Sequence, residues 1–450
     1  MNKNKKTIRE QARDIPVYKS CDVLVVGGGP AGSSAAASAA RAGAETILVE
    51  RYGYLGGLST GGLVIWIDRM SDWKGTKVIT GFADDLLDRL PGESILGPPK
   101  AVWGSKDPEI VNYWKSRSCA FQDTVTWSPT IDPEVLKNTS FEILIEYGVK
   151  LIMHSWAVAP VMEEDTIRGV IFESKAGRQA ILAKVVVDAT GDGDIFAMAG
   201  ESFESDINED SIHHTINVAF LCCGLDMERI INFTRTQPEE WKKILTKAHE
   251  LGIGTAPSPS PYNDTCVFMG PKMSGYNCLD IADLTEVEIK SRRRMKKVVD
   301  FYRGCLPGFE KARVSQTAPQ IGTRHSRRLI GRKKMVFEEW SMGKIHSDEI
   351  GVSPPPSSKY PNVSVPLSCL VPQKTENLIA AGRNLSCDAR THDFMREIPN
   401  CWLMGQAAGI DAAIAVKTGA NLRDVSISDV QKELICQGVY LQKQIAPEQD

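Results

Sequence analysis

A short glycine-rich segment, residues 27–32, constrains the fold more than any other part of this sequence. It follows an apolar run at residues 21–26 that predicts a buried strand, and an alanine-rich stretch at residues 33–42 predicts a helix after it. Residues 45–49 predict a second strand. This order of strand, turn, helix and strand is the context that a GxGxxG motif needs to bind a dinucleotide. The sequence therefore predicts an α/β fold that begins with a Rossmann-like unit.

Each glycine of the turn has a physical role. Gly27 permits the tight turn, Gly29 lets the backbone approach a pyrophosphate, and Gly32 lets the helix pack closely on the sheet. The start of the helix offers unpaired amides to the anion. Glu50 ends the second strand, where a carboxylate can accept hydrogen bonds from ribose hydroxyls and repel a 2′-phosphate. The motif alone is compatible with NAD or FAD, and its alternative is a tight connection without a ligand.

The segment that follows the second strand favours FAD. Residues 50–60 read Glu-Arg-Tyr-Gly-Tyr-Leu-Gly-Gly-Leu-Ser-Thr. They resemble the sequence after the second strand in the glutathione-reductase-type FAD fold. More narrowly, the chain resembles the FAD-dependent oxidoreductase family related to heterodisulfide-reductase and fumarate-reductase flavoproteins. The resemblance implies that Gly56 and Gly57 let the backbone pass close to the flavin chain, and that Ser59 and Thr60 offer hydroxyls or amides nearby.

A second stretch of the same resemblance ends a predicted meander of short strands. Residues 149–188 show alternating apolar positions, with turns near 163–166 and 175–178, and residues 185–194 read Val-Val-Val-Asp-Ala-Thr-Gly-Asp-Gly-Asp. The resemblance places Thr190 and Gly191 beside the pyrophosphate and adenosine, and the Val158 backbone beside the adenine. The alternatives are a turn that only closes a strand and a calcium-like loop, for which the EF-hand ligand spacing is missing.

The third stretch lies near the end of the chain. Residues 376–383 read Glu-Asn-Leu-Ile-Ala-Ala-Gly-Arg, and Pro399 precedes a predicted helix at residues 401–416. The resemblance places Gly382 and Arg383 near the ribityl chain and pyrophosphate, and the amide end of the helix at the flavin pyrimidine, where it would stabilise an anionic reduced flavin. The residues expected to bind FAD are Gly27, Gly29, Pro30, Ala31, Gly32, Glu50, Arg51, Gly56, Gly57, Leu58, Ser59, Thr60, Val158, Ala189, Thr190, Gly191, Asp194, Gly382, Arg383, Asn400 and Gly405.

Candidates for substrate chemistry lie between and after these stretches. Residues 319–328 resemble a signature of the family, whose members commonly carry an acidic residue where this chain has His325. His325 is a catalytic candidate that could shuttle a proton. His392 is the first candidate for general acid or base, since an unperturbed imidazole suits proton transfer near neutral pH. Arg324 and Arg396 could bind a carboxylate, or serve only as ion-pair partners. Further candidates are Arg327, Arg328, Arg390 and one of His213 and His214, which are expected on opposite faces of a strand.

Composition narrows the partners and the location. Lys and Arg total 53 against 56 Asp and Glu, so no broad positive field draws a nucleic acid. The basic run at residues 292–297 lies in a predicted helix, 284–302, and is interpreted as a solvated face. No uncharged apolar run reaches the roughly 20 residues that span a bilayer, and residues 1–13 lack an export pattern. We expect a cytoplasmic protein without a membrane span.

The cysteines, histidines and tryptophans leave alternatives open. The eleven cysteines contain no CxxC pattern, so free thiols are expected, and adjacent Cys222 and Cys223 favour two faces of one strand over a redox disulfide. No paired spacing suits a metal, and none is expected. The tryptophans between residues 64 and 128 either cap the substrate pocket or pack a domain interface. They are Trp66, Trp73, Trp103, Trp114 and Trp127.

Together these patterns predict a glutathione-reductase-type FAD-binding domain with an inserted α+β substrate domain. The FAD-binding domain is expected at residues 15–63, 131–200 and 360–425, the substrate domain at 64–130 and 201–359, and extensions at 1–14 and 426–450. The expected function is hydride exchange between the flavin and a small organic substrate. The alternatives are an electron-transfer subunit that works with an iron-sulfur partner, and a non-enzymatic binding protein on the same fold.

Overall fold

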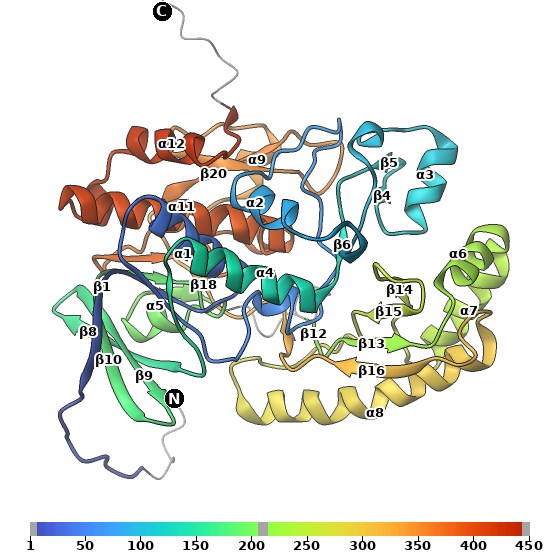
Figure 1. Ribbon diagram of the computed structural model, residues 1–450, viewed down its shortest axis with the longest axis horizontal. Helices are drawn as coiled ribbons and strands as arrows, with labels where there is room; N and C mark the ends of the chain where they lie inside the picture. The colour runs from blue at the N-terminus through green and yellow to red at the C-terminus, as the bar shows by residue number, and fades with distance from the viewer. Residues whose placement is uncertain (1–6, 206–214, 443–450) are drawn as a thin grey trace, which may run out of the picture.

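The computed structural model describes residues 7–205 and 215–442, which form a central sheet with helices on it and a second, smaller sheet beside it (Figure 1). The central sheet has the order β7-β2-β1-β10-β9-β8, and β21 pairs with the end of β10. Its strands are β1 (Val17–Val26), β2 (Thr46–Val49), β7 (Lys150–Ile152), β8 (Trp156–Glu163), β9 (Thr166–Ser174), β10 (Gly177–Asp188) and β21 (Leu378–Ala380).

The long strand β10 joins two kinds of pairing. It runs parallel to β1 along its length and parallel to β21 at its end, while its first half pairs with β9 in the antiparallel sense. The predicted meander is therefore confirmed as β8, β9 and β10, with turns at the expected places. The parallel ends of β1, β2, β10 and β21 lie at one edge of the sheet, where open α/β sheets bind ligands.

Both faces of the parallel strands are buried. Val23 and Val25 of β1 belong to the core under the long helices, whereas Leu24 and Val26 belong to the core on the opposite face. The apolar run at residues 21–26 therefore faces a core on each side of the sheet. Such a continuous apolar run is typical of a parallel strand that is buried on both faces. Helices α1 (Pro30–Arg41) and α11 (Ile398–Thr418) lie on the first face, and α5 (Asp194–Met198) packs against the second.

The two long helices pack with almost no space between their backbones. A Cβ atom on Gly405 would lie 2.1 Å from the carbonyl oxygen of Ala31, and one on Gly409 would lie 2.1 Å from that of Ala35. Both helices have proline in the first turn, which is preorganised for a helix start. They begin three residues earlier than predicted, because the sequence pattern places helix ends less well than helix cores.

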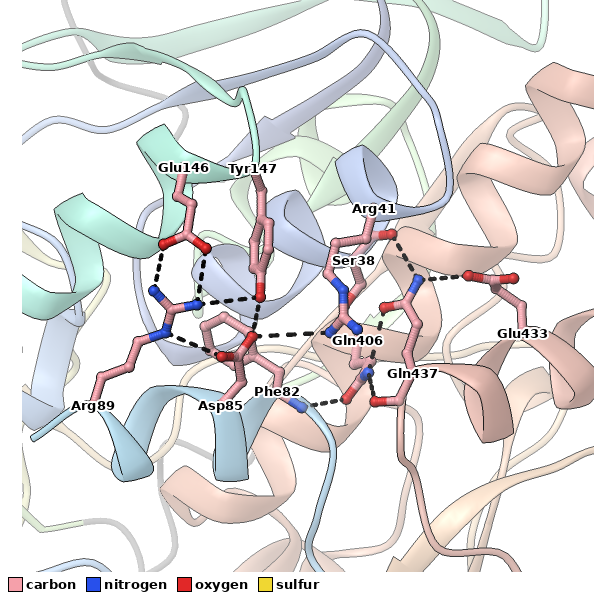
Figure 2. A network of polar contacts seen from close by, with 10 residues as sticks. All are labelled: Ser38, Arg41, Phe82, Asp85, Arg89, Glu146, Tyr147, Gln406, Glu433 and Gln437. Atoms are coloured by element: carbon pink, nitrogen blue, oxygen red, sulfur yellow. Dashed lines mark hydrogen bonds and ion pairs between the residues drawn. The ribbon is translucent and has the colours of Figure 1, made fainter.

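A network of polar contacts ties the last helix to the first (Figure 2). Gln406 of α11 accepts a hydrogen bond from the Phe82 amide at 2.9 Å and donates to the Gln437 carbonyl at 3.4 Å. Gln437 donates to the Ser38 carbonyl of α1 at 3.2 Å. The elements joined in this way include α2 (Phe82–Asp88), α4 (Pro133–Glu146) and α12 (Ile427–Cys436). Residues 427–442 of the expected C-terminal extension thus pack on the core formed by α1 and α11.

A second core lies beside the central sheet (Figure 1). Its antiparallel sheet has the order β14-β15-β13-β16 and is built from β13 (Phe220–Cys223), β14 (Ser258–Pro259), β15 (Thr265–Phe268) and β16 (Arg313–Thr317). Buried aromatic rings of Phe220, Phe268 and Tyr302 pack together there. Helices α6 (Met227–Thr236), α7 (Pro238–Glu250) and α8 (Ile281–Cys305) cover it. Cys222 is buried and Cys223 half-buried, so the prediction of opposite faces is confirmed.

Shorter elements connect the two cores. The guanidinium of Arg117 donates to both oxygens of Glu228 in α6, at 2.7 and 2.8 Å, and so joins the 64–130 region to the second core. The remaining elements are β3 (Ile95–Leu96), α3 (Pro108–Lys115), β4 (Ala120–Phe121), β5 (Thr124–Val125), β6 (Thr130–Ile131), β11 (Phe203–Glu204), β12 (Ile216–Asn217), β17 (Gly322–Thr323), β18 (Arg328–Leu329), α9 (Phe337–Ser341), β19 (Glu349–Ser353), β20 (Val363–Pro366) and α10 (Ala389–Met395).

Candidate functional site

A cavity opens at the edge of the central sheet where β1, β2, β10 and β21 end. Its walls come from segments that lie far apart in the sequence, and they include most of the residues that the sequence patterns indicated. The predicted residues that line it are Gly27, Gly29, Pro30, Ala31, Glu50, Arg51, Gly57, Leu58, Ala189, Thr190, Gly191, Asp194, Gly382, Arg383 and Arg396.

The glycine turn forms one wall. Gly27 has φ +103°, a conformation that L side chains rarely adopt, and a Cβ atom there would lie 2.5 Å from the Ala189 carbonyl oxygen. Above Gly29 the space is open, because a Cβ atom would meet nothing nearer than Gly57 Cα at 4.0 Å. Helix α1 starts at this point without a side-chain cap. Its first amides are therefore free to bind an anion in the cavity.

Glu50 is held rigidly at the next strand end. Its side chain is buried, and its two oxygens accept hydrogen bonds from the Gly28 amide at 2.6 Å and the Tyr52 amide at 2.8 Å. Burial raises the pKa of this carboxyl group, and the two amides oppose that effect. Since each carboxylate oxygen can accept more than one hydrogen bond, Glu50 can still accept hydroxyl donors from the cavity.

Tyr52 and Trp156, which the sequence patterns did not single out, stack with the predicted Arg51 beside Glu50. The Arg51 guanidinium lies 4.9 Å from the centre of the Tyr52 ring and 5.3 Å from that of Trp156. Trp156 and its neighbours Ser155 and Ala157 line the cavity, whereas the expected Val158 is not among the lining residues. Trp156 stands at the start of β8, and an exposed aromatic residue at that strand end is the signal that could have found it.

The loop after β10 is organised by a buried carboxyl group. Asp188 Oδ1 accepts hydrogen bonds from the Thr190 amide at 3.1 Å and the Thr190 hydroxyl at 2.7 Å, and Oδ2 accepts from the Phe196 amide at 2.9 Å. Burial raises the pKa of Asp188 to about 6, although these donors oppose the shift. The Asp188 carboxyl group therefore holds Thr190 and Gly191 against the cavity, and the Thr190 hydroxyl is already engaged.

Two ion pairs connect this loop to other segments, one to the segment after β21 and one to residues 320–328. Arg383 donates to Asp192 at 2.6 Å and to the Ser326 hydroxyl at 3.2 Å. Burial alone would raise the pKa of Asp192, but the Arg383 guanidinium and the Ser326 hydroxyl together hold that pKa below its usual value. Arg327 pairs with Asp194 at 2.9 Å. The loop after β10 is thus tied both to Arg383 and to Arg327.

The start of helix α11 forms the opposite end of the cavity. Ile398 and Cys401, which the sequence patterns did not single out, line it together with Gln320. Asn400 is buried beside them and donates to the Phe394 carbonyl at 2.9 Å. Gly405 lies one turn further along, under Ala31, so it brings α11 close to α1.

Several predicted residues support the walls without lining the cavity. The Ser59 hydroxyl donates to the Gly56 carbonyl at 2.7 Å, and the Thr60 hydroxyl donates to the Leu55 carbonyl. These side-chain donors therefore hold the 55–60 turn. The predicted residues outside the lining set are Gly32, Gly56, Ser59, Thr60, Val158, Asn400, Gly405, His392, Arg324 and His325.

His392 lies behind the wall and holds it. Its ring is buried, and Nε2 lies 2.8 Å from the Arg383 carbonyl oxygen. Burial, followed by the nearby His325 and Arg396, lowers the pKa of His392 well below its usual value. The His392 ring is therefore neutral near pH 7, and its Nε2–H donates to the backbone of a cavity-lining residue.

The other catalytic candidates gather around His392. The His325 ring centre lies 5.1 Å from that of His392, and the Arg324 guanidinium donates to the Thr215 hydroxyl at 2.9 Å. Arg396 pairs with Glu397 at 3.1 Å and alone among these candidates lines the cavity. His213 and His214 lie outside the described residues.

The remaining expectations concern thiols, metals, tryptophans and membranes. All eleven cysteines are free. The described part of the chain holds no group of three or more His, Cys, Asp or Glu side chains that could bind a metal ion. None of the five tryptophans between residues 64 and 128 lines the cavity, and Trp103 stacks on Trp127 at 5.1 Å. Within residues 7–205 and 215–442, every helix is too short or too polar to cross a membrane.

Comparison with known families identifies the cofactor of this protein. The family described as FAD dependent oxidoreductase matches residues 22–434. The chain belongs to the FAD-dependent oxidoreductase family. Its cofactor is accordingly FAD, and the walls fit that assignment: the backbone is open above Gly29, the first amides of α1 are uncapped, and Glu50 faces the cavity. Members of this family are flavoenzymes, so the prediction of an FAD-dependent enzyme is confirmed.

Several solved structures are similar to this chain at low identity. A geranylgeranyl bacteriochlorophyll reductase-like protein from Thermoplasma acidophilum is 13% identical over 93% of this chain and 83% of its own, with a TM-score of 0.44. The p-nitrophenol 4-monooxygenase of Pseudomonas putida is 14% identical over 93% and 84%, with a TM-score of 0.42. The L-proline dehydrogenase of P. horikoshii is 12% identical over 90% and 95%, with a TM-score of 0.44.

Replacing Glu50 by glutamine should weaken FAD binding by about 10- to 100-fold. The substitution places an amide donor against the Gly28 or Tyr52 amide, and the loss of a charge-assisted hydrogen bond costs about 1.5–3 kcal/mol. Titration of the apoprotein with FAD, followed by flavin fluorescence, measures the change. Glu163→Gln on the exposed end of β8 is the matched control and should bind FAD like the wild type. Equal affinity of both variants would contradict the role of Glu50.

Proposed function

We propose that this protein exchanges a hydride between FAD and a small organic substrate. The proposal rests on one observation: the glycine turn, Glu50 and the start of α11 all face a single cavity. Glu50 and Trp156 would hold the adenosine of an extended FAD, Gly29 would meet its pyrophosphate, and the start of α11 would meet its flavin. When bound, it supplies the hydride chemistry, and the protein supplies position, exclusion of water and proton transfer.

The proposal includes the division of the chain into domains. The glutathione-reductase-type FAD domain comprises residues 15–63, 131–200 and 360–425, and the substrate domain comprises 64–130 and 201–359. The separate core around Phe220 and Phe268 supports the second unit. Gln320, which follows β16 of that core, lines the cavity beside Arg396, so both units meet where the flavin is expected.

The residues at the end of the cavity near the start of α11 have distinct tasks in the proposed reaction. Arg396 faces the substrate side, with Arg324 and His325 behind it. The buried, neutral His392 holds the Arg383 backbone through Nε2, which leaves Nδ1 as the atom that can accept a proton. His392 therefore serves as general acid or base, or as the residue that positions the cavity wall.

The decisive experiment begins with the visible spectrum of the purified protein. A bound flavin is expected, and an anaerobic panel of small metabolites and reduced nicotinamides should contain a compound that bleaches it. Bleaching by one class of small molecule supports hydride exchange. Bleaching by a co-purifying iron-sulfur protein, with none by any small molecule, would replace the proposal with the electron-transfer alternative.

Replacing His392 by alanine should slow flavin reduction by the active compound about 100-fold or more, because general acid or base catalysis contributes that much. FAD affinity should stay within a few-fold, since His392 does not line the cavity. Stopped-flow absorbance measures both properties. His392→Asn keeps a donor for the Arg383 carbonyl. Recovery in this variant would assign His392 a positioning role, and unchanged reduction in the alanine variant would remove it from the mechanism.

A further inference from the structure

Three basic side chains from separate segments converge at the flavin end of the cavity. Lys272 follows β15, Arg324 follows β17, and Arg396 ends α10. Burial and then the Arg396 guanidinium lower the pKa of Arg324 to about 10. Burial, followed by Arg324 and Arg396, also lowers the pKa of Lys272. Contacts between their neighbours bring these segments together. The His325 ring, next to Arg324, lies 5.1 Å from the ring of His392, which is one turn before Arg396. Ile216 pairs with Thr323 and with Met273, the neighbours of Arg324 and Lys272.

The cluster of Lys272, Arg324 and Arg396, here called the cationic cluster, reaches the cavity through Arg396. Arg396 lines the wall with Gln320. The Arg396 Nε donor and the Gln320 Oε1 acceptor are both buried without a hydrogen-bond partner in the described structure. Buried polar atoms are nearly always paired in native proteins. An acceptor on a ligand in the cavity would supply the missing partner of the Arg396 donor.

Two carboxylates among the described residues, Glu397 and Asp393, act on the cationic cluster. Arg396 pairs with Glu397 at 3.1 Å, and burial raises the pKa of both carboxyl groups. The Arg396 guanidinium still has its buried Nε donor available, and its planar fork matches the two oxygens of a carboxylate.

We infer that the cationic cluster binds the carboxylate group of the substrate, which makes the substrate a small organic acid. This inference rests on the proposed function and names its substrate class. Arg396 contacts the carboxylate directly, because its guanidinium lines the cavity and has a free donor. Arg324 and Lys272 act from behind as electrostatic support. The pyrophosphate of FAD has its own site at the other end, on the open backbone of Gly29.

Equilibrium binding to the FAD-loaded protein tests this inference without any turnover. The probes are acetate, propionate and benzoate, each compared with its neutral amide, and the readout is the difference spectrum of the flavin. Carboxylates are expected to bind at least tenfold more tightly than the matched amides. No preference for the carboxylates would overturn the inference. A protein that binds no FAD, or a flavin that no small molecule reduces, would instead contradict the proposed function.

Variants locate the carboxylate within the cluster. Arg396→Gln should weaken carboxylate binding at least tenfold while FAD affinity stays within a few-fold, and Arg396→Lys should retain more of the binding because it keeps the charge. Arg324→Gln and Lys272→Gln should have smaller effects of the same sign. The control is Arg292→Gln on the exposed face of α8, which should change nothing. Loss of FAD instead of carboxylate in the Arg396 variants would show that the cluster serves the cofactor and would overturn the inference.

Discussion

Replacing Gly405 by valine is expected to abolish FAD binding and to lower the free energy of unfolding by about 3 kcal/mol or more. A Cβ atom at this position would lie 2.1 Å from the carbonyl oxygen and 2.7 Å from the carbonyl carbon of Ala31. Both are backbone atoms, so no side-chain rotation can relieve the clash. Helices α1 and α11 must move apart, and the first amides of α1 leave the position where they meet the pyrophosphate.

Urea denaturation and FAD titration measure the two effects of Gly405→Val separately. The control is Gly304→Val in α8, where an added Cβ would meet nothing within 4 Å. This control should keep its FAD affinity and lose no stability, because valine has a higher helix propensity than glycine. If Gly405→Val bound FAD like the wild type, the close contact between α1 and α11 would not be needed for the cofactor site.

Replacing Asp411 by asparagine is expected to stabilise the protein by about 4 kcal/mol at pH 7. Asp411 is fully buried in the middle of α11, and neither of its oxygens has a hydrogen-bond partner in the described structure. Burial raises the pKa of this carboxyl group from 3.8 to about 8. The wild-type carboxyl group is therefore protonated in the folded protein at pH 7 but ionised in the unfolded chain.

The sign of the pH dependence follows from this difference. Between pH 4 and 8 the folded state binds one more proton at Asp411 than the unfolded state does, so the stability of the wild type falls as the pH rises through this window. Asp411→Asn removes that contribution. The two proteins should be close in stability near pH 4 and diverge up to pH 8, as measured by urea denaturation at several pH values.

A surface carboxylate provides the comparison for Asp411. Asp429→Asn in α12 replaces an exposed side chain paired with Lys432, and it should change stability by less than about 0.5 kcal/mol at every pH. If Asp411→Asn retained the same slope of stability against pH as the wild type, the Asp411 carboxyl group would have to be ionised in the folded protein. The raised pKa of Asp411 would then be wrong.

Local patterns predicted the parts of the site that depend on the backbone. The turn at Gly27 requires a positive φ, and a Cβ atom at Gly32 would lie 1.7 Å from the Gly27 carbonyl oxygen. Such constraints act between residues a few positions apart, so they leave a readable spacing in the sequence. The same holds for Glu50 at the end of β2 and for the loop of Thr190 and Gly191 after β10.

Contacts between segments that lie far apart in the chain leave no such readable spacing in the sequence. Trp156, Gln320 and Cys401 line the cavity because β8, the segment after β16 and the start of α11 meet at one sheet edge. Which side chain at each of these places faces inward depends on the register of the strands and the packing of the helices. Ser59 and Thr60 illustrate the reverse case: their hydroxyls donate to neighbouring carbonyls of the turn and do not line the cavity.

The sequence by itself determined the Rossmann-like start of the fold, the family, and the cofactor, because glycine turns and strand ends are encoded by residues close together in the chain. Only the tertiary structure decided how the site is completed. It placed His392 behind the wall with its Nε2 on the Arg383 carbonyl, and it brought Lys272 beside Arg324 and Arg396. Charge repulsion and burial act through space, so they arise only when the folded chain brings such residues together.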